Sequence, residues 1–417
     1  MPNKDERGVW LDEASGVIID LNRWRANLYH QSDVACLYDM SFPAHMGLVK
    51  AAEGAWIKRQ GGGELYLWLD SSLEPTTYTN IGSLPEACFA EPDASPNGVF
   101  MAMWAAMDEN YAFFDLHGVD WDARRSLAPE VGQNMTDQEL FDVFVAALEG
   151  LDDGHVQLIV DPIGYHSPSV APAWTVGRDF SRDGLNQTAR DAIGTPLTTF
   201  ENADLEYGLR DDGIGYVLIT GMSTDPSFGE MDSTLSREVF AQIARDLAGA
   251  CGIIVDVRYN PGGNDGTAFA YAGHFTQTAR EVLSKRARDG DGWTPWFNAT
   301  LTPAPSEVYL GQPVVLLTSR LTGSGAEIFT MAMRDLPQVT VMGENTGSGL
   351  SDILGVSLPN GWKFGLSNQE YATSDGSIYE ATGIPPEIVI TIDPDALARG
   401  EDPVLQAAIA KLLNSGN

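Results

Sequence analysis

Over its second half the chain alternates between two hydrophobic patterns. Short apolar runs bounded by turn residues predict buried strands, whereas apolar positions three and four residues apart predict helices. The predicted strands cover 215–220, 252–257, 313–317 and 339–343, and the predicted helices cover 235–247 and two stretches that begin near 267 and 326. This alternation is typical of an α/β fold, in which helices cover a parallel or mixed sheet. We therefore assign an α/β core to residues 211–398, including a hairpin over 353–370, and a C-terminal helix to 399–417.

The first half of the chain shows other patterns. Residues 1–92 carry short strand-like pieces separated by turns and predict a small β-rich domain. Residues 98–160 carry apolar stripes at helical spacing and predict a helical subdomain. Residues 161–210 are rich in Pro, Ser, Asp and Gly, and we expect an irregular connection there.

One histidine of the helical subdomain stands where two predicted elements meet. Thr136 and Glu139 form a capping-box pattern that begins a helix, and we expect this helix to end at 152–154 with Gly154 as its C-cap. The next residues, 156–160, alternate like a strand. His155 is therefore predicted to lie on a helix-to-strand turn.

The charge of the chain excludes several classes of function. The 417 residues include 58 acidic and 25 basic side chains, which gives a net charge of -33. Such a surface repels nucleic acid and anionic lipid, so neither is an expected partner. No apolar stretch approaches the ~20 residues of a membrane helix. No His-Glu-x-x-His motif and no paired cysteine spacing occurs, so we expect neither a metal nor another cofactor.

The three cysteines and the start of the chain bear on the compartment. Cys36 and Cys88 could form a disulfide in an exported protein, whereas Cys251, at the edge of an apolar strand, is expected to be a buried free thiol. The first residues have no apolar core and do not form a signal peptide. The protein is therefore expected inside the cell, unless a leader has been removed from it.

Ser324 stands between the predicted strand 313–317 and the helix that follows. At a helix N-terminus a serine is either an N-cap or a nucleophile whose oxyanion is held by unpaired backbone N–H groups, and the residue alone favours the cap. The loop Asn-Pro-Gly-Gly at 260–263 follows the neighbouring strand. Because sites in α/β sheets form at the carboxyl ends of the strands, this loop and Gly325 could together supply an oxyanion hole.

A serine nucleophile needs a base that takes its proton. Lys363 and Lys411 are the only lysines after Ser324, and they lie in a hairpin strand and near the end of the chain. His155 stands on a turn beside acidic residues, and imidazole is the commonest general base. A lone histidine is more often structural, so the residues alone leave this role open.

Four segments together resemble the tail-specific, or C-terminal processing, serine peptidases, and within them the tricorn-like branch. They are Leu-Asp-Asp-Gly-His at 151–155, Ile-Ile-Val-Asp-Val-Arg-Tyr-Asn-Pro-Gly-Gly at 253–263, Thr-Ser-Arg-Leu-Thr-Gly-Ser-Gly-Ala-Glu at 318–327 and Tyr-Glu-Ala-Thr-Gly-Ile-Pro-Pro-Glu at 379–387. Each motif alone is moderately specific, and four in the family's order make the resemblance strong.

The resemblance implies a catalytic role for three residues. Ser324 would be the nucleophile, His155 the general base, and Glu380 the acid that orients and stabilises the histidine, as in other Ser-His-acid triads. The substrate would be a polypeptide or a peptide. The resemblance also favours export, with the signal peptide removed.

The resemblance further implies an oxyanion hole and a fold. Gly325 would supply one N–H group, and Gly262 or Gly263 would supply the other. The fold would be the crotonase-like α/β core of these enzymes.

The chain departs from the family pattern at three places. The region 346–350 has no lysine where the Ser–Lys branch of the family has one, which leaves histidine as the base. Gly154 stands where the tricorn enzyme has a serine, so no fourth active-site residue is assigned there. The stretch 161–200 shows no series of strands typical of a PDZ domain.

Two other functions are compatible with the same features. A non-catalytic module for apolar ligands, as in the interphotoreceptor retinoid-binding protein, would resemble this chain in fold, and a small-substrate esterase or amidase would use the same residues. The presence of both a nucleophile and a base favours a serine peptidase that works through an acyl-enzyme.

Overall fold

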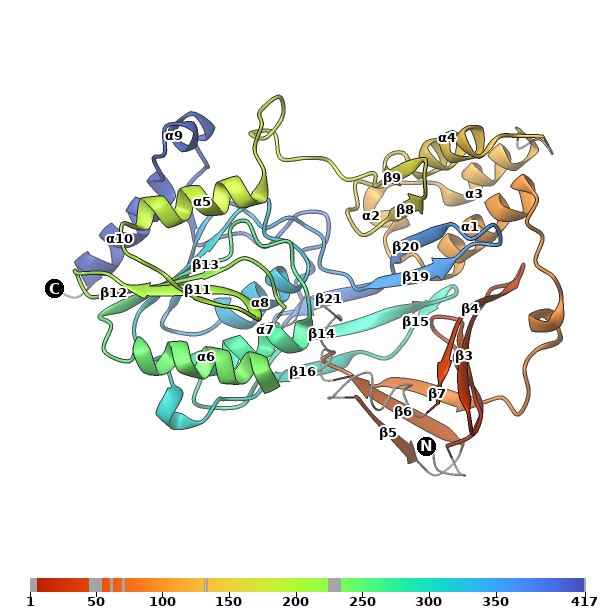
Figure 1. The fold of residues 1–417 in the computed structure, drawn as a ribbon, viewed down its shortest axis with the longest axis horizontal. Coiled ribbons are helices and arrows are strands. Elements are labelled where there is room, and N and C mark those ends of the chain that lie inside the picture. Colours follow the sequence, from red (N-terminus) through yellow and green to blue (C-terminus); the bar gives the residue numbers. More distant parts are fainter. Residues whose placement is uncertain are drawn as a thin grey trace.

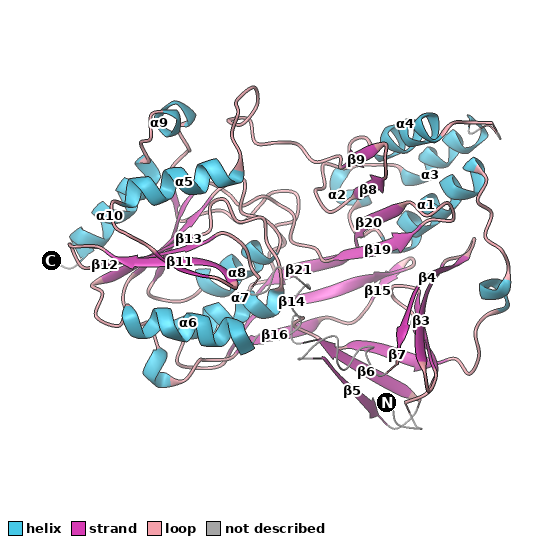
Figure 2. Cartoon of the chain, in the orientation of Figure 1, coloured by secondary structure: helices cyan, strands magenta, loops and turns pink. Residues whose placement is uncertain are grey.

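The computed structural model describes residues 6–44, 55–60, 63–69, 72–130, 132, 134–223 and 234–415. In this part of the chain the fold is mixed α/β, and its elements are distributed over two halves joined by long strands (Figures 1 and 2). Residues 45–54, within the predicted β-rich domain, lie outside the described residues.

The half of the molecule on the left in Figure 1 is built on a mixed sheet. Its strands, in spatial order, are β10 (Thr198–Phe200), β11 (Ala203–Leu209), β12 (Ile214–Ile219), β13 (Gly252–Asp256), β17 (Val314–Thr318), β18 (Val339–Gly343) and β22 (Ile388–Val389). The strands from β12 to β22 run parallel, as the alternation of strands and helices predicts, and β10 and β11 form an antiparallel edge.

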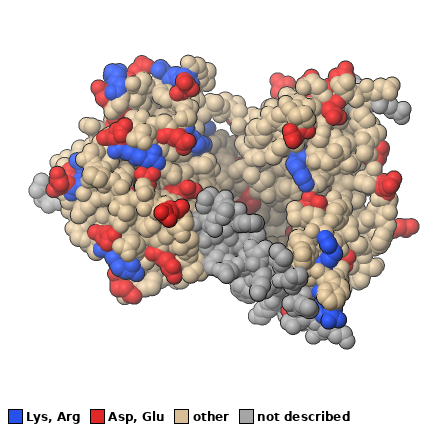
Figure 3. All heavy atoms as spheres, viewed as in Figure 1, with Lys and Arg blue, Asp and Glu red and all other residues tan. Residues whose placement is uncertain are grey.

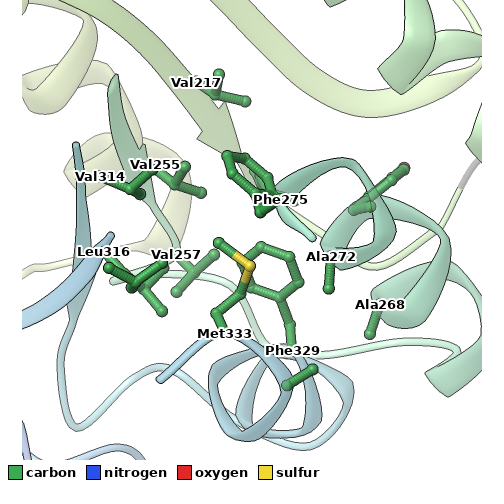
Figure 4. Close-up of a cluster of buried hydrophobic side chains, with 14 of the residues drawn as sticks. Val217, Val255, Val257, Ala268, Ala272, Phe275, Val314, Leu316, Phe329 and Met333 are labelled. Carbon is green, nitrogen blue, oxygen red and sulfur yellow. The ribbon is translucent and has the colours of Figure 1, made fainter. Parts of the chain in front are cut away.

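Helices cover both faces of this sheet. They are α5 (Arg182–Ile193), α6 (Thr234–Asp246), α7 (Asp265–Ala272), α8 (Gly325–Arg334), α9 (Pro394–Ala398) and α10 (Pro403–Ser415). Val255 packs with Phe329 in the core under α6, α7 and α8, whereas the preceding residue of the strand, Ile254, packs with Leu405 under α5 and α10. Figure 4 shows the first of these cores. Burial on both faces explains why the parallel strands are continuous apolar runs.

The half of the molecule on the right in Figure 1 contains a sheet that two distant parts of the chain form together. Its strands, in spatial order, are β19 (Ile353–Ser357), β20 (Lys363–Ser367), β8 (Gln157–Val160) and β9 (Gly164–His166). The helices of this half are α1 (Pro96–Asn110), α2 (Phe114–His117), α3 (Trp121–Arg124) and α4 (Asp137–Leu148). Phe144 of α4 and Phe364 of β20 belong to one core, so the helices and this sheet pack together. The predicted hairpin over 353–370 is confirmed by the β19–β20 pairing.

The N-terminal part forms an antiparallel sheet. Its strands are β1 (Gly8–Asp12), β2 (Val17–Leu21), β3 (Arg25–Gln31), β4 (Cys36–Pro43), β5 (Ala55–Gln60), β6 (Glu64–Leu69) and β7 (Thr76–Asn80). Cys36 and Cys88, a possible pair from the sequence, form a disulfide with Cα atoms 4.7 Å apart. A further sheet, which runs between the two halves in Figure 1, contains β14 (Arg280–Asp289), β15 (Gly292–Trp293), β16 (Phe297–Leu301) and β21 (Gln369–Thr373).

Three expectations from the sequence are wrong. The stretch 161–210 is not irregular throughout, because it holds β9, α5, β10 and β11. Helix α4 ends at Leu148, and Gly150, not Gly154, adopts the left-handed conformation that follows it. The apolar pattern continues beyond the helix because Leu151 is also buried. Cys251 is a free but exposed thiol, since it precedes β13 at the amino edge of the sheet.

A buried ion pair joins the central sheet to the C-terminal helix. The Arg258 guanidinium, which is fully buried, lies 2.6 Å from an Asp256 oxygen and 2.7 Å from an Asp402 oxygen. Asp402 also accepts the N–H of Leu405 in the first turn of α10. Removing one partner of such a buried pair leaves an uncompensated charge in the interior.

We expect Asp402→Ala to lower the free energy of unfolding by about 3–5 kcal/mol, because Arg258 would keep its charge and lose half of its counter-ions. Asp395→Ala is the matched control, since Asp395 forms an exposed ion pair with Arg178, and it should cost no more than about 1 kcal/mol. Urea denaturation measures both values. Equal losses in the two variants would contradict this role of Arg258.

Candidate active site

The loops that follow three neighbouring parallel strands lie together at one edge of the sheet. Strands β13, β17 and β18 lie side by side and end at Asp256, Thr318 and Gly343. The glycine loop, the Ser324 segment and a loop over 344–352 follow them in that order. Carboxyl ends of parallel strands are the usual location of sites in α/β sheets, and the first two of these loops were predicted to meet here.

Ser324 stands in a strained backbone conformation directly before helix α8. Its φ is 49° and its ψ is -128°, which a non-glycine residue adopts at a cost of about 1–3 kcal/mol. Its N–H lies 2.9 Å from the carbonyl oxygen of Gly349 and 3.1 Å from Oε2 of Glu327. These backbone contacts hold the turn, so the serine stands on a fixed corner between strand and helix.

The buried carboxylate of Glu327 ties this turn to the loop over 344–352. Its Oε2 accepts the N–H groups of Ser324 and Gly349, and its Oε1 accepts the hydroxyl of Thr346 and the N–H of Ser348. Burial raises the pKa of Glu327 to about 7, although these hydrogen bonds oppose the shift. The sequence interpretation did not assign Glu327 a role. The available signal was its place three residues after Ser324, the spacing of a capping box.

The glycine loop lies against the serine so closely that side chains do not fit. A Cβ on Gly262, whose φ is 113°, would lie 2.5 Å from the Cβ of Ser324. A Cβ on Gly325 would lie 2.5 Å from the carbonyl oxygen of Gly263. The N–H of Gly262 donates to Oδ1 of Asn260 at 2.8 Å and is therefore occupied. Among the described residues, the N–H groups of Gly263 and Gly325 have no hydrogen-bond partner.

His155 enters the site from the other half of the molecule. It lies two residues before Gln157, where β8 begins, and its N–H donates to Oδ1 of the buried Asp153 at 2.8 Å. Tyr111 donates its hydroxyl to the other oxygen of Asp153 at 3.0 Å. The imidazole lies over Gly349, because a Cβ on that glycine would be 3.7 Å from Cε1 of His155. Ser324 and His155 thus both lie next to Gly349.

The imidazole is held in a low-dielectric environment. Its Nδ1 is buried and has no hydrogen-bond partner. Burial lowers the pKa of His155 below its ordinary value of 6.5, and the nearby charges of Asp153 and Asp352 oppose that shift. The histidine is therefore neutral, the form in which it accepts a proton, at neutral pH.

Glu380 is buried behind the same loop. Its Oε2 accepts the N–H of Leu350 at 3.0 Å and the N–H of Ser351 at 3.2 Å. No hydrogen bond between Glu380 and His155 occurs among the described residues. Burial raises the pKa of Glu380 well above 4.5, and the charges of Asp153 and Glu327 raise it further. Glu380 therefore contacts the loop that carries Gly349, next to the histidine, and not the imidazole itself.

Ser324 and His155 line one cavity of about 940 Å³. Its wall also includes Gly263, Gly323 and Gly349. Figure 3 shows a hollow between the two halves of the molecule on the face that it displays. The predicted serine, histidine and glycine loop are therefore brought together in a space large enough for a peptide segment.

Neither a cluster of metal ligands nor a membrane-spanning helix occurs among the described residues. Within the ranges that the structure describes, no three His, Cys, Asp or Glu side chains are grouped as a metal site requires. No helix in these ranges is long and apolar enough to cross a bilayer.

Two family models match the chain. Residues 213–390, which include Ser324, the glycine loop and Glu380, match the model of peptidase family S41. Residues 92–149, which end six residues before His155, match the model of the tricorn protease C1 domain.

Two known peptidases are similar in sequence to parts of this chain. The chain is 28% identical over 206 residues to the tricorn protease of Thermoplasma volcanium, a match that covers 48% of this chain and 17% of that protein. It is 24% identical over 251 residues to a chloroplastic C-terminal processing peptidase of Tetradesmus obliquus, with 60% and 48% covered. The chain therefore spans less than half of the length of both relatives.

A solved structure shares the fold over most of this chain. The crystal structure of a candidate peptidase from Parabacteroides merdae is similar over 77% of this chain and 98% of its own, with a TM-score of 0.65 and 28% identity. This likeness confirms a mixed α/β fold of the kind found in that protein. With the two family models and the named relatives, it confirms the resemblance predicted from the four motifs: the chain is similar to the C-terminal processing and tricorn proteases, and its residues 213–390 match peptidase family S41.

Proposed function

We propose that this protein hydrolyses peptide bonds through an acyl-enzyme, with Ser324 as the nucleophile and His155 as the general base, on a crotonase-like α/β core. The observation that carries the proposal is the position of Ser324. It stands on a strained turn, beside two amides that have no partner among the described residues, and in one cavity with a neutral, half-buried histidine. An N-cap alone requires neither the strain nor the histidine.

The first chemical step transfers a proton from Ser324 to His155 while the serine oxygen attacks the substrate carbonyl carbon. The tetrahedral intermediate carries an oxyanion, and the N–H groups of Gly263 and Gly325 are the donors that stabilise it. Of the two glycines predicted as the second donor, Gly262 is the weaker candidate because Asn260 already accepts its N–H. His155 then protonates the leaving amine, and water hydrolyses the acyl-enzyme with the same base.

Glu380 supports the histidine by way of the loop. Its carboxylate fixes the amides of Leu350 and Ser351, and Gly349 directly before them lies under the imidazole. A negative charge there also stabilises the imidazolium that forms during the reaction. Glu380 is thus a positioning residue. It orients and stabilises the histidine, as the resemblance implies, but it does so through the loop.

Ser324→Ala and His155→Ala should each lower the rate of peptide hydrolysis by about 10⁴-fold or more, because nucleophile and base act as one unit. Ser324→Ala should also abolish covalent labelling by a fluorophosphonate probe. Ser169→Ala is the matched control, since Ser169 is another serine of the same cavity wall. Full labelling of Ser324→Ala, or its loss in Ser169→Ala, would refute the assignment.

Gly262→Ala should abolish labelling, because the added Cβ would overlap the Cβ of Ser324 and displace it. Gly361→Ala provides the comparison: Gly361 also has a positive φ, of 89°, but nothing lies within 4 Å of an added Cβ. Both variants carry the backbone strain, and only the first carries the clash. Similar labelling rates in the two variants would show that the close approach has no role in catalysis.

The rate of labelling should depend on pH through the buried carboxyl groups. The reaction requires a neutral His155 and an ionised Glu380 and Glu327, so protonation of any of them slows it. Burial sets the pKa of Glu327 at about 7 and that of Glu380 well above 4.5, whereas His155 titrates below 6.5. The rate should therefore fall as the pH decreases through about 7.

Glu327→Gln, which is uncharged like the protonated carboxyl group, should react more slowly at every pH, and the decline that remains should lie at lower pH. The change removes a group that titrates near 7, and it removes a charge that raises the pKa of Glu380. Asp375→Asn is the control, since Asp375 is exposed and titrates at about 2. A profile of Glu327→Gln that coincides with that of the unmodified protein would contradict this origin of the pH dependence.

A further inference from the structure

A second cavity adjoins the catalytic one. It has a volume of about 960 Å³, and both the N-terminal sheet and the sheet with β14 and β16 (Figure 1) line it. Its wall includes Thr77 of β7 and Trp296, which directly precedes β16. Four residues belong to the walls of both cavities: Gly263, Asn264, Asp352 and Ile353. The two cavities therefore meet at the glycine loop and at the end of the loop over 344–352.

The place where the cavities meet lies next to the reaction centre. Gly263, whose N–H is a proposed oxyanion donor, belongs to both walls, whereas Ser324 lines the catalytic cavity. Because the oxyanion of the intermediate points to this amide, the scissile bond lies where the cavities meet. A peptide that extends from this bond in both directions has one flank in the catalytic cavity and the other in the second cavity.

Trp296 gives the second cavity a rigid aromatic surface. Its side chain is 41% exposed, and the guanidinium of Arg286 lies 4.4 Å from the centre of its ring. The same guanidinium lies 4.3 Å from the ring of Trp293 and 2.6 Å from an oxygen of Glu370, so it is itself held in place. An aromatic ring that is fixed before a ligand arrives loses little side-chain entropy on binding, and such rings are typical anchors of interfaces.

The charge of the second cavity limits what can bind beside Trp296. Four acidic side chains line it, and no lysine or arginine does so among the described residues of its wall: the four are Asp12, Glu74, Asp265 and Asp352. Lys285, behind the wall, lies 3.4 Å from Glu74 and 2.9 Å from Asp352. The other two accept the hydroxyl groups of Ser15 and Tyr371. The excess of negative charge disfavours an acidic side chain in this cavity.

We infer that the second cavity is part of the substrate cleft and binds a flanking segment of an extended polypeptide, with an apolar or aromatic side chain against Trp296. Acidic side chains are disfavoured there, and the N-terminal sheet thus takes part in substrate binding. The inference rests on the proposed function for the place of the scissile bond, but binding in the cavity does not require catalysis. The bound segment precedes or follows the scissile bond, and both have the same chemistry.

A peptide attached at position 324 by a disulfide tests the inference without catalysis. The protein carries Ser324→Cys and also Cys251→Ser, because Cys251 is an exposed free thiol. The probes are two capped undecapeptides of glycine and serine with a central cysteine, and they carry benzoylphenylalanine at the first or at the last position. Five extended residues reach roughly 17 Å. Irradiation should cross-link one of the two probes to residues 72–78 or 294–297, and mass spectrometry of proteolytic fragments identifies the site.

The probe that reacts with these segments shows which flank of the peptide lies in the second cavity. Cross-links of both probes that are confined to other residues, or the absence of any cross-link, would overturn the inference. This measurement uses the protein with Trp296 intact, so it decides the matter even where a variant of Trp296 does not fold.

The same attachment measures the side-chain preference. Phenylalanine, glycine or glutamate takes the end position that the cross-link identifies, and the readout is the concentration of 2-mercaptoethanol that releases half of the peptide. This concentration should be about 10-fold higher for phenylalanine than for glycine, as burial of an aromatic side chain implies, and lowest for glutamate. Equal values for the three peptides would contradict the proposed preference.

Trp296→Ala in the same protein should remove the advantage of phenylalanine over glycine. Trp24→Ala is the matched control, since Trp24 is 61% exposed and has the guanidinium of Arg23 4.8 Å from the centre of its ring, but is not among the wall residues of either cavity. An advantage that survives Trp296→Ala, or that Trp24→Ala removes, would refute the assignment of the anchor to Trp296.

Fluorophosphonate labelling of the unmodified protein separates this inference from the proposed function. Failure of the unmodified protein to react would refute the proposed function, whereas the cross-links would still decide whether a peptide at position 324 enters the second cavity. Normal labelling together with cross-links outside residues 72–78 and 294–297 would overturn the inference alone.

Discussion

The carboxylate of Glu327 is the interaction on which the geometry of the active site depends. A buried charge is unfavourable unless several donors surround it, and here two oxygen atoms accept four hydrogen bonds. Two of the donors are the amides of Ser324, on the serine turn, and of Gly349, on the loop next to the histidine. One side chain thus fixes both the strained serine turn and the glycine under the histidine, so a change in its charge acts on both.

The histidine reaches this place because two distant segments form one sheet. Strand β8 pairs with β20, and Gln157 lies opposite Gly365, so the turn with His155 is fixed next to the loop that precedes the hairpin. Asp153 and Tyr111 hold the turn from behind. Ser324 belongs to the half with the mixed sheet and His155 to the half with β8 and helices α1–α4, and the cavity lies where these halves meet. The relative placement of the two halves therefore determines whether the serine and the histidine can react.

The sequence predicted those features that depend on local patterns. Buried parallel strands appear as continuous apolar runs, so β12, β13, β17 and β18 were predictable, as was the convergence of their loops. The sequence did not predict that Gly262 would have its N–H occupied, because that depends on the side-chain rotamer of Asn260. Nor did it predict the four contacts of Glu327, which come from a loop without a periodic pattern. Helix α5 was missed because its polar face and the preceding Pro and Gly residues resemble a loop.

The central claim is that Ser324 is the nucleophile, that the oxyanion of the intermediate points to the N–H groups of Gly263 and Gly325, and that His155 takes the proton of the serine. A crystal structure of the protein after reaction with a fluorophosphonate tests this claim most directly, because the phosphoryl oxygen marks the position of the oxyanion. The account predicts phosphorus bonded to Oγ of Ser324, the phosphoryl oxygen about 2.7–3.1 Å from both glycine nitrogens, and the imidazole within hydrogen-bond reach. An adduct on another residue, or a phosphoryl oxygen directed away from both amides, would contradict it.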